Sequence, residues 1–357
     1  MDIETGMTTR QGQPRKRVLS GMRSTGKLHL GNYVGALQNW VSMQEQYECF
    51  FFVADWHALT TDYADTSQVK QNSIEVLLDW LAAGLDPERC TMFIQSHVPQ
   101  HAELHLLLSM ITPLGWLERV PTYKEQRENI AEKDLGTYGF LGYPVLQAAD
   151  ILLYKGDFVP VGEDQVAHVE LTREIARRFN QFYQHHGNAV FPEPQALKTR
   201  AAKLPGTDGR KMSKSYGNTI LLTDPEVVVR QKLKTMVTDP ARVRRTNPGN
   251  PDVCPVGDLH KIFSSPETIA KVDTGCRTAG IGCIECKSWA ADSLVQILSP
   301  MQERRKKYEQ NPCLAWDILE SGSERARKEA SKTMNQVREA MNMSLDYEAP
   351  SSAQGAK

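Results

Sequence analysis

Short apolar runs and longer helix-period stripes alternate along the first half of the chain. The apolar runs have the length of strands that are covered on both faces, and they occupy residues 18–22, 49–54, 91–94 and 158–161. Between them, apolar positions recur at helical period over residues 31–46, 67–81, 144–154 and 166–179. This alternation predicts an α/β fold with a doubly wound parallel sheet. Such sheets bind ligands beyond the carboxyl ends of their strands, here near residues 21–26, 55 and 95–97.

Strand signals fade past the middle of the chain. Helical periodicity replaces them over residues 225–237, 290–310 and 325–341. The change predicts an α/β domain over 18–217 and a helical domain over 218–345. We expect residues 1–17 to be a disordered N-terminal extension and residues 346–357 to be a frayed tail.

Composition changes this picture little. The 357 residues contain 40% hydrophobic and 24% charged side chains, which is ordinary for a water-soluble globular protein. The net charge of -1 does not decide for or against a nucleic-acid partner, because a local basic patch can vanish in the sum. No apolar run approaches the roughly 18–20 residues that span a bilayer, and the N-terminal stretch lacks the apolar segment of a secretory signal. We therefore expect a cytoplasmic protein without membrane contact.

Two short motifs point to phosphate chemistry. His29-Leu30-Gly31-Asn32 follows the first predicted strand and opens a helix, so backbone N–H groups and the helix dipole face an anion there. Lys211-Met212-Ser213-Lys214-Ser215 places two lysines on a loop after the flexible stretch 206–209. Alone, the histidine would be a cap or a surface residue, and the lysines would be a solvated face. Together, the motifs predict a site that holds the triphosphate of ATP from two sides and activates a carboxylate as its adenylate.

Residues 28–32 and 211–215 resemble the His-Ile-Gly-His and Lys-Met-Ser-Lys-Ser motifs of class I aminoacyl-tRNA synthetases. Four further stretches narrow the resemblance to tryptophanyl-tRNA synthetases of the bacterial type: 20–26, 54–59, 143–150 and 161–165. The resemblance covers about residues 17–345. It implies a Rossmann-like catalytic domain, a helical anticodon-binding domain and a homodimer. It also implies that L-tryptophan is activated with ATP and Mg²⁺ and is then transferred to tRNA(Trp).

The resemblance also implies roles for residues of this chain. Its catalytic residues are His29, Asn32, Lys211 and Lys214. Its ATP site is built from Arg23, Ser24, Thr25, Gly31, Asn32, Gly162, Glu163, Asp164, Leu204, Lys211, Met212, Ser213, Lys214 and Ser215. Its substrate pocket contains Asp150, His57, Tyr143, Gln147 and Gln165. Residues 162–164 match a ribose-binding loop, and as a local pattern they would merely cap the next helix.

The chemistry of tryptophan supports the role implied for Asp150. The indole N–H is a donor without an acceptor, and a buried carboxylate is its natural partner. A site built to satisfy a buried polar group rejects amino acids that lack the donor far better than an apolar pocket does. The alternative is a carboxylate on a helix surface, but the apolar neighbours Ala148, Ala149, Ile151 and Leu152 favour burial.

Three residues depart from the pattern of the synthetase family. Asn32 replaces the last histidine of the general motif, although asparagine is usual for tryptophan specificity and still donates to phosphate. Arg23 stands where many relatives have glutamine, and Gln147 stands where many have methionine. The change at Arg23 affects the binding site for ATP, and the change at Gln147 affects the walls of the substrate pocket. In the connecting segment 111–142, Lys124 is either a further phosphate-binding lysine or a solvated one.

Four of the seven cysteines cluster within about residues 250–290. Cys254, Cys276, Cys283 and Cys286 are separated by 21, 6 and 2 residues, which suits a closed four-sulfur metal site. Spacing alone leaves zinc and iron–sulfur open. Some tryptophanyl-tRNA synthetases carry a similar insert that holds a [4Fe-4S] cluster, so the resemblance favours that cluster, with Zn²⁺ as the alternative. The remaining cysteines are expected to be core residues: Cys49, Cys90 and Cys313.

Basic residues flank this insert: Arg230, Lys232, Lys234, Arg242, Arg244 and Arg245 before it, and Arg304, Arg305, Lys306 and Lys307 after it. They are either solvated helix faces or contacts to RNA phosphates, with base reading left to unstacked loop bases.

Three other functions remain open at this point. A tyrosyl-tRNA synthetase shares the architecture, and a nucleotidyltransferase acting on a small metabolite shares the phosphate motifs. An RNA-binding or redox-sensing relative would use the cysteines alone. The intact lysines and Asp150 argue against this last function.

Overall fold

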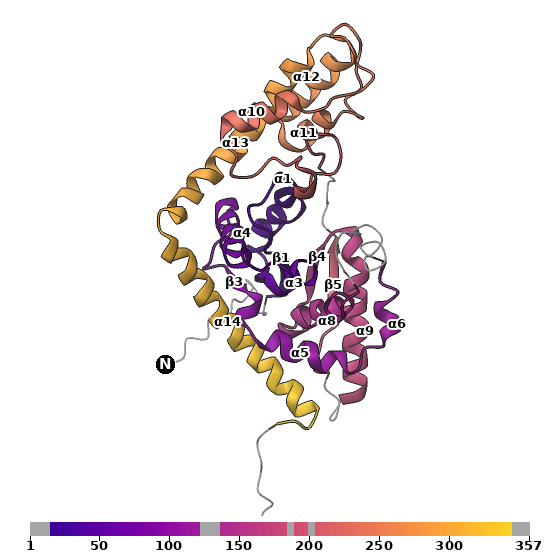
Figure 1. The fold of residues 1–357 in the computed structure, drawn as a ribbon, viewed down its shortest axis with the longest axis vertical. Helices are drawn as coiled ribbons and strands as arrows, with labels where there is room; N and C mark the ends of the chain where they lie inside the picture. Colours follow the sequence, from indigo (N-terminus) through magenta and orange to yellow (C-terminus); the bar gives the residue numbers. More distant parts are fainter. Residues whose placement is uncertain (1–14, 122–135, 184–188, 199–203, 345–357) are drawn as a thin grey trace, which may run out of the picture.

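A five-stranded parallel sheet forms the centre of the computed structural model, which describes residues 15–121, 136–183, 189–198 and 204–344 (Figure 1). In spatial order the strands are β3 (Cys90–Ile94), β2 (Glu48–Ala54), β1 (Arg17–Arg23), β4 (Phe158–Val161) and β5 (Gln195–Lys198). All four pairings are parallel, and the β1–β2 register runs from Arg17 opposite Glu48 to Arg23 opposite Ala54. The predicted α/β fold with a parallel sheet is confirmed.

The order of the strands reverses at β1. From β1 the chain moves outward to β2 and β3 on one side, and it then returns to place β4 and β5 on the other side. Doubly wound sheets bind their ligands at such a switch point, beyond the carboxyl ends of the strands. The turn after β1 and the loop after β4 therefore lie at the expected ligand edge.

Helices join the strands and cover both faces of the sheet (Figure 1). Between β1 and β3 lie α1 (Leu30–Asn32), a π-helical segment η1 (Tyr33–Leu37), α2 (Gln38–Met43), α3 (Asp55–Asp62) and α4 (Val69–Ala83). Between β3 and β5 lie η2 (Gln95–His97), α5 (Gln100–Ser109), α6 (Leu114–Leu117), α8 (Tyr138–Leu153), η3 (Glu163–Gln165) and α9 (Val166–Tyr183). After β5 follow η4 (Lys214–Tyr216), α10 (Glu226–Thr235), α11 (Pro255–Phe263), α12 (Pro266–Arg277), α13 (Cys283–Glu309) and α14 (Pro312–Ala340).

Alternate side chains of β2 face opposite layers of the core. Phe51 stacks on Trp40 with the ring centroids 4.5 Å apart, in the layer that includes α2 and α4. Phe50 stacks on Tyr154 at 4.9 Å, in the layer that includes α5, α8 and α9. Because both faces are covered, β2 is one continuous apolar run in the sequence.

Several elements differ from the sequence prediction. The helix predicted to start at Pro144 starts at Tyr138, because Thr137 caps it by accepting from the N–H of Phe140 at 3.2 Å. Pro144 then lies inside α8, where it has no N–H for a backbone hydrogen bond and its ring crowds the preceding turn. The hydrophobic pattern does not reveal α3, which directly follows β2, or α5, which follows β3 after the short η2. It also does not reveal β5, which is a short edge strand without an apolar run.

The predicted helical C-terminal region is confirmed and forms the upper end and one outer side of the molecule (Figure 1). Helix α13 passes α4, and α14 continues along β3 and α5. Gly322 permits the close approach, since a Cβ there would lie 1.8 Å from the carbonyl oxygen of Met92. The boundary between residues 217 and 218 stays a prediction. None of the helices in the described part of the chain has the length and apolar character that crossing a membrane requires.

The isolated cysteines are not all in the core. Cys49 and Cys90, at the starts of β2 and β3, are buried as predicted. The prediction is wrong for Cys313, which is exposed. Residues 309–314, where α13 ends and α14 begins, are all exposed, and the buried face of α14 starts only at Ala315.

Candidate active site

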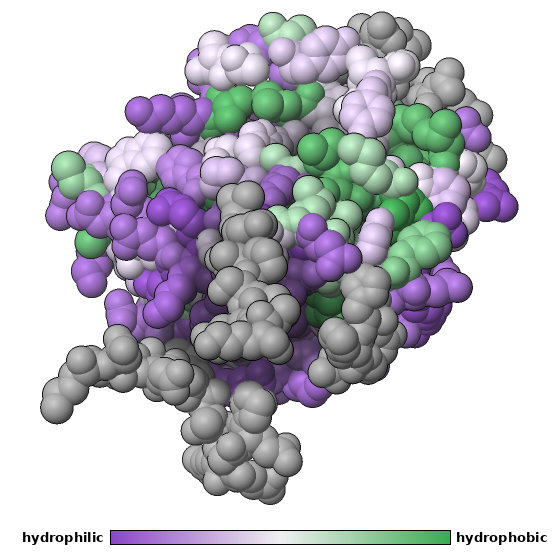
Figure 2. Space-filling model, turned by 90° about the horizontal axis from the view of Figure 1, so that it is seen from below, coloured by the Kyte–Doolittle hydropathy of each residue, from purple (hydrophilic) through white to green (hydrophobic). Residues whose placement is uncertain are grey.

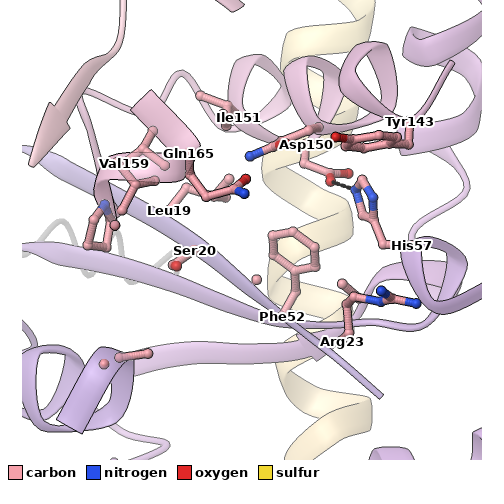
Figure 3. Close-up of a pocket in the computed structure, with 18 of the residues that line it drawn as sticks. Leu19, Ser20, Arg23, Phe52, His57, Tyr143, Asp150, Ile151, Val159 and Gln165 are labelled. Carbon is pink, nitrogen blue, oxygen red and sulfur yellow. Dashed lines mark hydrogen bonds and ion pairs between the residues drawn. The ribbon is translucent and has the colours of Figure 1, made fainter. Parts of the chain in front are cut away.

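A cavity of about 360 Å³ lies beside β1, α3 and α8 (Figure 3). Seven residues that the sequence assigns to ATP or to tryptophan line it: Arg23, His57, Tyr143, Gln147, Asp150, Gly162 and Gln165. Apolar side chains complete the walls, among them Phe52 of β2 and Val159 and Val161 of β4. The structure thus brings the residues of the predicted pocket together from separate segments of the chain.

Asp150 is the buried polar centre of this pocket, only 1% exposed. Its Oδ1 accepts from the side-chain amide of Gln95 at 2.7 Å and lies 2.6 Å from Nδ1 of His101. Its Oδ2 lies 2.7 Å from Nε2 of His57 (Figure 3). Burial acts to raise the pKa of Asp150, but hydrogen bonds from His101 and His57 outweigh it and hold the pKa below its ordinary value. Asp150 is therefore an ionised acceptor, and the burial predicted from its neighbours is confirmed.

Arg23, one of the residues that depart from the family pattern, is fixed against α3. Its guanidinium donates to the carbonyl of Ala58 at 3.2 Å and to the hydroxyl of Thr61, and it pairs with Asp62 at 3.3 Å. Burial lowers its pKa, although the charge of Asp62 opposes this. The side chain therefore forms part of the pocket wall in a defined position.

His29 starts the first helical segment after β1. It is the N-cap of α1: its Nδ1 accepts from the N–H of Gly31 at 3.1 Å, and its own N–H donates to Oδ1 of Asn32 at 3.0 Å. Burial, with the charges of Lys214 and Lys211, lowers the pKa of His29 to about 4. The ring is therefore neutral near pH 7, and it carries its proton on Nε2 because Nδ1 is an acceptor.

The lysine motif lies next to this turn, so the structure brings the two phosphate motifs together. Nζ of Lys214 donates to the carbonyl of Thr25 at 2.6 Å, and the N–H of Leu30 donates to the carbonyl of Ile220 at 2.9 Å. Asn218, which is buried, fixes the loop by accepting from the N–H of Ser213 at 2.8 Å. The Lys214 side chain reaches solvent, but its ammonium end is partly covered, and this burial lowers its pKa.

The other residues assigned to ATP lie after β1, after β4 and in or beside the lysine loop. Buried Met212 donates its N–H to the carbonyl of Leu204 at 2.9 Å, so Leu204 supports the lysine loop through its backbone. The hydroxyls of Ser213 and Ser215 are 2.9 Å apart. Residues 162–164 follow β4, and Glu163 pairs with Lys198 at 3.1 Å. Among the remaining positions, Ser24 is buried and Lys211 is exposed, and Lys124 lies outside the described residues.

Comparison with known proteins agrees with this geometry. The family of tRNA synthetases class I (W and Y) matches residues 11–299. A tryptophan–tRNA ligase of Thermotoga maritima is 55% identical over 329 residues, which cover 92% of this chain and 99% of that protein. The chain belongs to the tryptophan branch of the class I tRNA synthetases. A tryptophan–tRNA ligase of Ralstonia nicotianae is 50% identical over 394 residues, covering 92% of this synthetase and 98% of the relative.

The resemblance extends to solved structures. The tryptophanyl-tRNA synthetase of Campylobacter jejuni complexed with ADP and tryptophan superposes with a TM-score of 0.81 at 33% identity. The match covers 91% of this synthetase and 99% of the other chain. The assignment of fold and family is therefore based on matches that extend over nearly the whole length of these relatives.

A second buried aspartate, which the motifs did not reveal, supports the phosphate turn of this synthetase. Asp79 of α4 is fully buried; its Oδ2 accepts from the N–H of Leu28 at 2.6 Å, and its Oδ1 accepts from Arg305 at 2.5 Å. Burial raises the pKa of Asp79 to about 6, although the charge of Arg305 opposes the shift. The sequence does offer a signal, since Asp79 interrupts the otherwise apolar stretch 76–83.

Two basic residues expected to face solvent or tRNA are buried instead. Arg305 of α13 also pairs with Glu75 and with Glu309, so it joins α13 to α4. Arg242 donates to Sγ of Cys276 at 3.6 Å and to the carbonyl of Ile281. The expectation of RNA contact is wrong for these two arginines, because each guanidinium is committed within the protein.

The four clustered cysteines come from three helices that adjoin one another. Cys254 is the N-cap of α11, Cys276 lies near the end of α12, and Cys283 and Cys286 lie in the first turn of α13. Burial raises the pKa of Cys286 to about 12, and the neighbouring thiols of Cys254, Cys276 and Cys283 add to the shift. Over the described ranges, however, no three His, Cys, Asp or Glu side chains are arranged to hold a metal ion. The predicted metal centre is therefore not shown.

Proposed function

We propose that the cavity beside Asp150 and the paired phosphate motifs form the site of a tryptophan–tRNA ligase. L-Tryptophan is activated with ATP to tryptophanyl-adenylate and pyrophosphate, and tryptophan is then transferred to the 3′ end of tRNA(Trp). The observation that carries the proposal is Asp150, an ionised acceptor that is 1% exposed and lines a cavity of about 360 Å³. The curated relatives have this activity, and the C. jejuni structure holds ADP and tryptophan.

In the pocket, we assign to Asp150 the hydrogen bond from the indole N–H. His57, Tyr143, Gln147 and Gln165 surround the rest of the amino acid, an assignment supported by their place in the cavity walls. Phenylalanine has no ring donor, so it would leave the buried carboxylate without its partner, and such a mismatch is rejected strongly.

At the phosphate turn, we assign to His29 and Asn32 the positioning of the ATP phosphates, and to Lys211 and Lys214 the charge that develops on pyrophosphate. The Nε2–H of neutral His29 and the ammonium of Lys214 are donors in the same region of the site. Residues 162–164, beyond the end of β4, would hold the ribose. ATP arrives with Mg²⁺ on its phosphates, which offsets part of their charge.

The chemistry asks the chain mainly for position and charge. A carboxylate oxygen of tryptophan attacks the α-phosphorus in line, the bond to the bridging oxygen breaks, and pyrophosphate leaves with the electron pair. A ribose hydroxyl of the tRNA then attacks the activated carbonyl, and AMP leaves. Negative charge grows on the leaving pyrophosphate during this step. The ammonium groups of Lys211 and Lys214 would lower the activation barrier by stabilising that charge, without forming a covalent bond.

ATP–pyrophosphate exchange tests this proposal directly. We expect exchange with tryptophan and no exchange with tyrosine or phenylalanine. When tRNA(Trp) is added, we expect tryptophan to be transferred to it. Exchange with tyrosine alone would replace the proposal with tyrosyl-tRNA synthetase. Adenylate formation without any transfer to tRNA would favour a small-metabolite nucleotidyltransferase.

We further propose that the four clustered cysteines hold a [4Fe-4S] cluster, with Zn²⁺ as the alternative. Four thiols that act on one another at the adjoining ends of three helices supply the soft donor set that both metals need. A metal there would order the helical region, which we assign to anticodon binding. Anaerobic purification should give a protein with visible absorption and about four iron atoms per chain. A colourless protein with one zinc would select the alternative.

We also propose a homodimer that works in the cytoplasm. Exposed apolar residues lie on or beside α5, α6 and α8: Leu106, Met110, Leu114 and Tyr138. Figure 2 shows hydrophobic side chains on the face of the molecule that carries these helices. Sedimentation should give twice the mass of one chain, and Met110→Glu should shift the equilibrium toward the monomer. A monomer at micromolar concentration would contradict this part of the proposal.

A further inference from the structure

The two oxygens of Asp150 are not equivalent. Oδ1 has two donors, the amide of Gln95 at 2.7 Å and Nδ1 of His101 at 2.6 Å. Oδ2 has one donor among the described residues, Nε2 of His57 at 2.7 Å. Because a carboxylate oxygen accepts about two hydrogen bonds, Oδ1 is filled and Oδ2 keeps one acceptor position. The side chain lines the cavity, so Oδ2 is the oxygen that can accept from a ligand.

His101 controls this asymmetry. Its ring is fully buried on α5, with Nδ1 at Asp150 and Nε2 2.9 Å from the hydroxyl of Tyr154. Since Asp150 is ionised, Nδ1 must carry a proton, and Nε2 makes the second hydrogen bond of the ring, to the Tyr154 hydroxyl. These hydrogen bonds form a chain that connects Tyr154 through His101 to Oδ1 of Asp150.

Aromatic packing keeps this chain in place. The His101 ring lies 5.9 Å from Phe52, 6.0 Å from Phe93 and 5.4 Å from Tyr154, measured between ring centroids. Tyr154 is fully buried as well. A buried polar chain of this kind is rigid when every member is satisfied, because the low local dielectric strengthens each hydrogen bond.

Gln95 shows that the surroundings are arranged around Oδ1. Its amide nitrogen faces the carboxylate, and its own Oε1 is buried with no hydrogen-bond partner among the described residues. Such an unsatisfied acceptor costs roughly 1–3 kcal/mol. The opposite orientation of the amide would place its oxygen against the carboxylate, which is worse. In this orientation the Gln95 amide nitrogen donates to Oδ1 of Asp150, while the Gln95 amide oxygen stays without a hydrogen bond.

We propose that His101 and Tyr154 are positioning residues that determine tryptophan specificity: they fill Oδ1 of Asp150, and so turn its remaining acceptor position on Oδ2 toward the indole N–H. The inference rests on the proposed function, since it assumes that tryptophan occupies the cavity. Neither residue lines the cavity, so both act through Asp150. Their loss should reduce the preference for an N–H donor without removing the cavity.

A substrate pair isolates this effect. Exchange kcat/KM is measured with tryptophan and with its benzothienyl analogue, in which sulfur replaces the indole N–H. In His101→Leu we expect the ratio of tryptophan to analogue to fall about 10-fold to 100-fold, through a higher KM for tryptophan. The value for the analogue and the KM for ATP should stay within about threefold. Tyr154→Phe, which removes only the hydroxyl, should lower the ratio by less, and His101→Asn should restore part of it by keeping a donor near Nδ1.

Leu108→Ala is the matched control, since Leu108 is fully buried on the same helix and has no polar link to Asp150. It should lower the melting temperature and leave the substrate ratio unchanged. An unchanged ratio in folded His101→Leu overturns the inference. If that variant does not fold, an unchanged ratio in Tyr154→Phe has the same force. Failure of the proposed function would appear differently, because the wild type itself would then not activate tryptophan. If the wild type activates tryptophan and prefers it to the analogue, either unchanged ratio counts against the inference alone.

Discussion

The two halves of the proposed site are built in opposite ways. In the pocket half, Asp150 is enclosed and its partners are side chains of other helices, namely His57, His101 and Gln95. In the phosphate half, Lys211 is exposed, and Lys214 reaches solvent while its ammonium donates to the backbone carbonyl of Thr25. In the pocket half, the charged side chain is buried and hydrogen-bonded to protein side chains, whereas in the phosphate half the charged side chains are exposed to solvent.

The difference follows from what each half has to recognise. A single N–H must be distinguished from a C–H, and only a desolvated acceptor in a fixed direction can do this. A triphosphate is recognised by charge, and clustered lysines must stay hydrated until the anion arrives because they repel one another. The lowered pKa values of His29 and Lys214 show the penalty for charge in this half before ATP binds.

The largest effect that would test this division is the loss of Lys214. Lys214→Ala should lower the rate of tryptophan-dependent pyrophosphate exchange about 10²-fold to 10³-fold, because one preorganised cation is lost where charge develops. Tryptophan affinity, measured calorimetrically, should change less than twofold. Lys332→Ala removes an exposed lysine of α14 and should change neither quantity. Parallel losses of exchange and tryptophan affinity in Lys214→Ala would mean that the halves are not separate.

Asp150→Asn tests the pocket half with a smaller effect. The amide removes the ionised acceptor and, with its oxygen kept at the Oδ1 position beside His101 and Gln95, places its NH2 group at the Oδ2 position against His57. Tryptophan affinity should fall about 10-fold to 100-fold, as expected for a hydrogen bond to a charged group. ATP affinity, measured separately by fluorescence or calorimetry, should stay within twofold of the wild type. An equal loss for ATP would point to collapse of the site rather than loss of one contact.

The sequence is informative where the signal is local. The strands β1 to β4 and the burial of Asp150 rest on patterns within a few neighbouring residues, and the structure agrees with both. The same holds for the membership of five pocket residues, which the family motifs supply: His57, Tyr143, Gln147, Asp150 and Gln165. The two phosphate motifs are local patterns as well; the structure places them side by side, and their role stays a prediction.

The sequence fails where partners are distant or where tertiary contacts override a local pattern. His101 of α5 reaches both Asp150 of the neighbouring α8 and Tyr154 at the end of that helix, and nothing in the sequence marks His101 as their partner. Arg305 belongs to a basic run that is typical of a solvated helix face. It is buried nevertheless, because its guanidinium pairs with Asp79 and Glu75 of α4. Each of these depends on which helix packs beside which, and that is decided by the fold.

Acid titration contrasts the buried aspartates of the two halves. Asp79 has a folded pKa of about 6, above its unfolded value, so its folded form binds the extra proton between about pH 6 and 3.8. Relative to Asp79→Asn, the wild type should therefore gain about 1 kcal/mol of unfolding free energy as the pH falls from 7 to 5. Asp150 has a lowered pKa and stays ionised in this range. The difference between wild type and Asp150→Asn should thus be flat from pH 7 to 5 and should fall only below about pH 3.8. Urea unfolding at each pH measures both, and equal slopes would remove the contrast.

The smallest expected effect concerns the proton of His29. Its pKa near 4 lies below the unfolded value, so this histidine costs stability as the pH falls from about 6.5 toward 4. Phosphates of ATP would favour the charged ring and raise that pKa, so ATP binding near pH 5.5 should take up a fraction of one proton. Calorimetry in two buffers of different ionisation enthalpy measures the uptake. His29→Asn keeps a residue suited to the N-cap of α1 but cannot titrate, and it should lose this uptake while still binding ATP. Equal uptake in the variant would assign the proton to ATP itself or to another group, and would leave the phosphate half with charge supplied by the lysines alone.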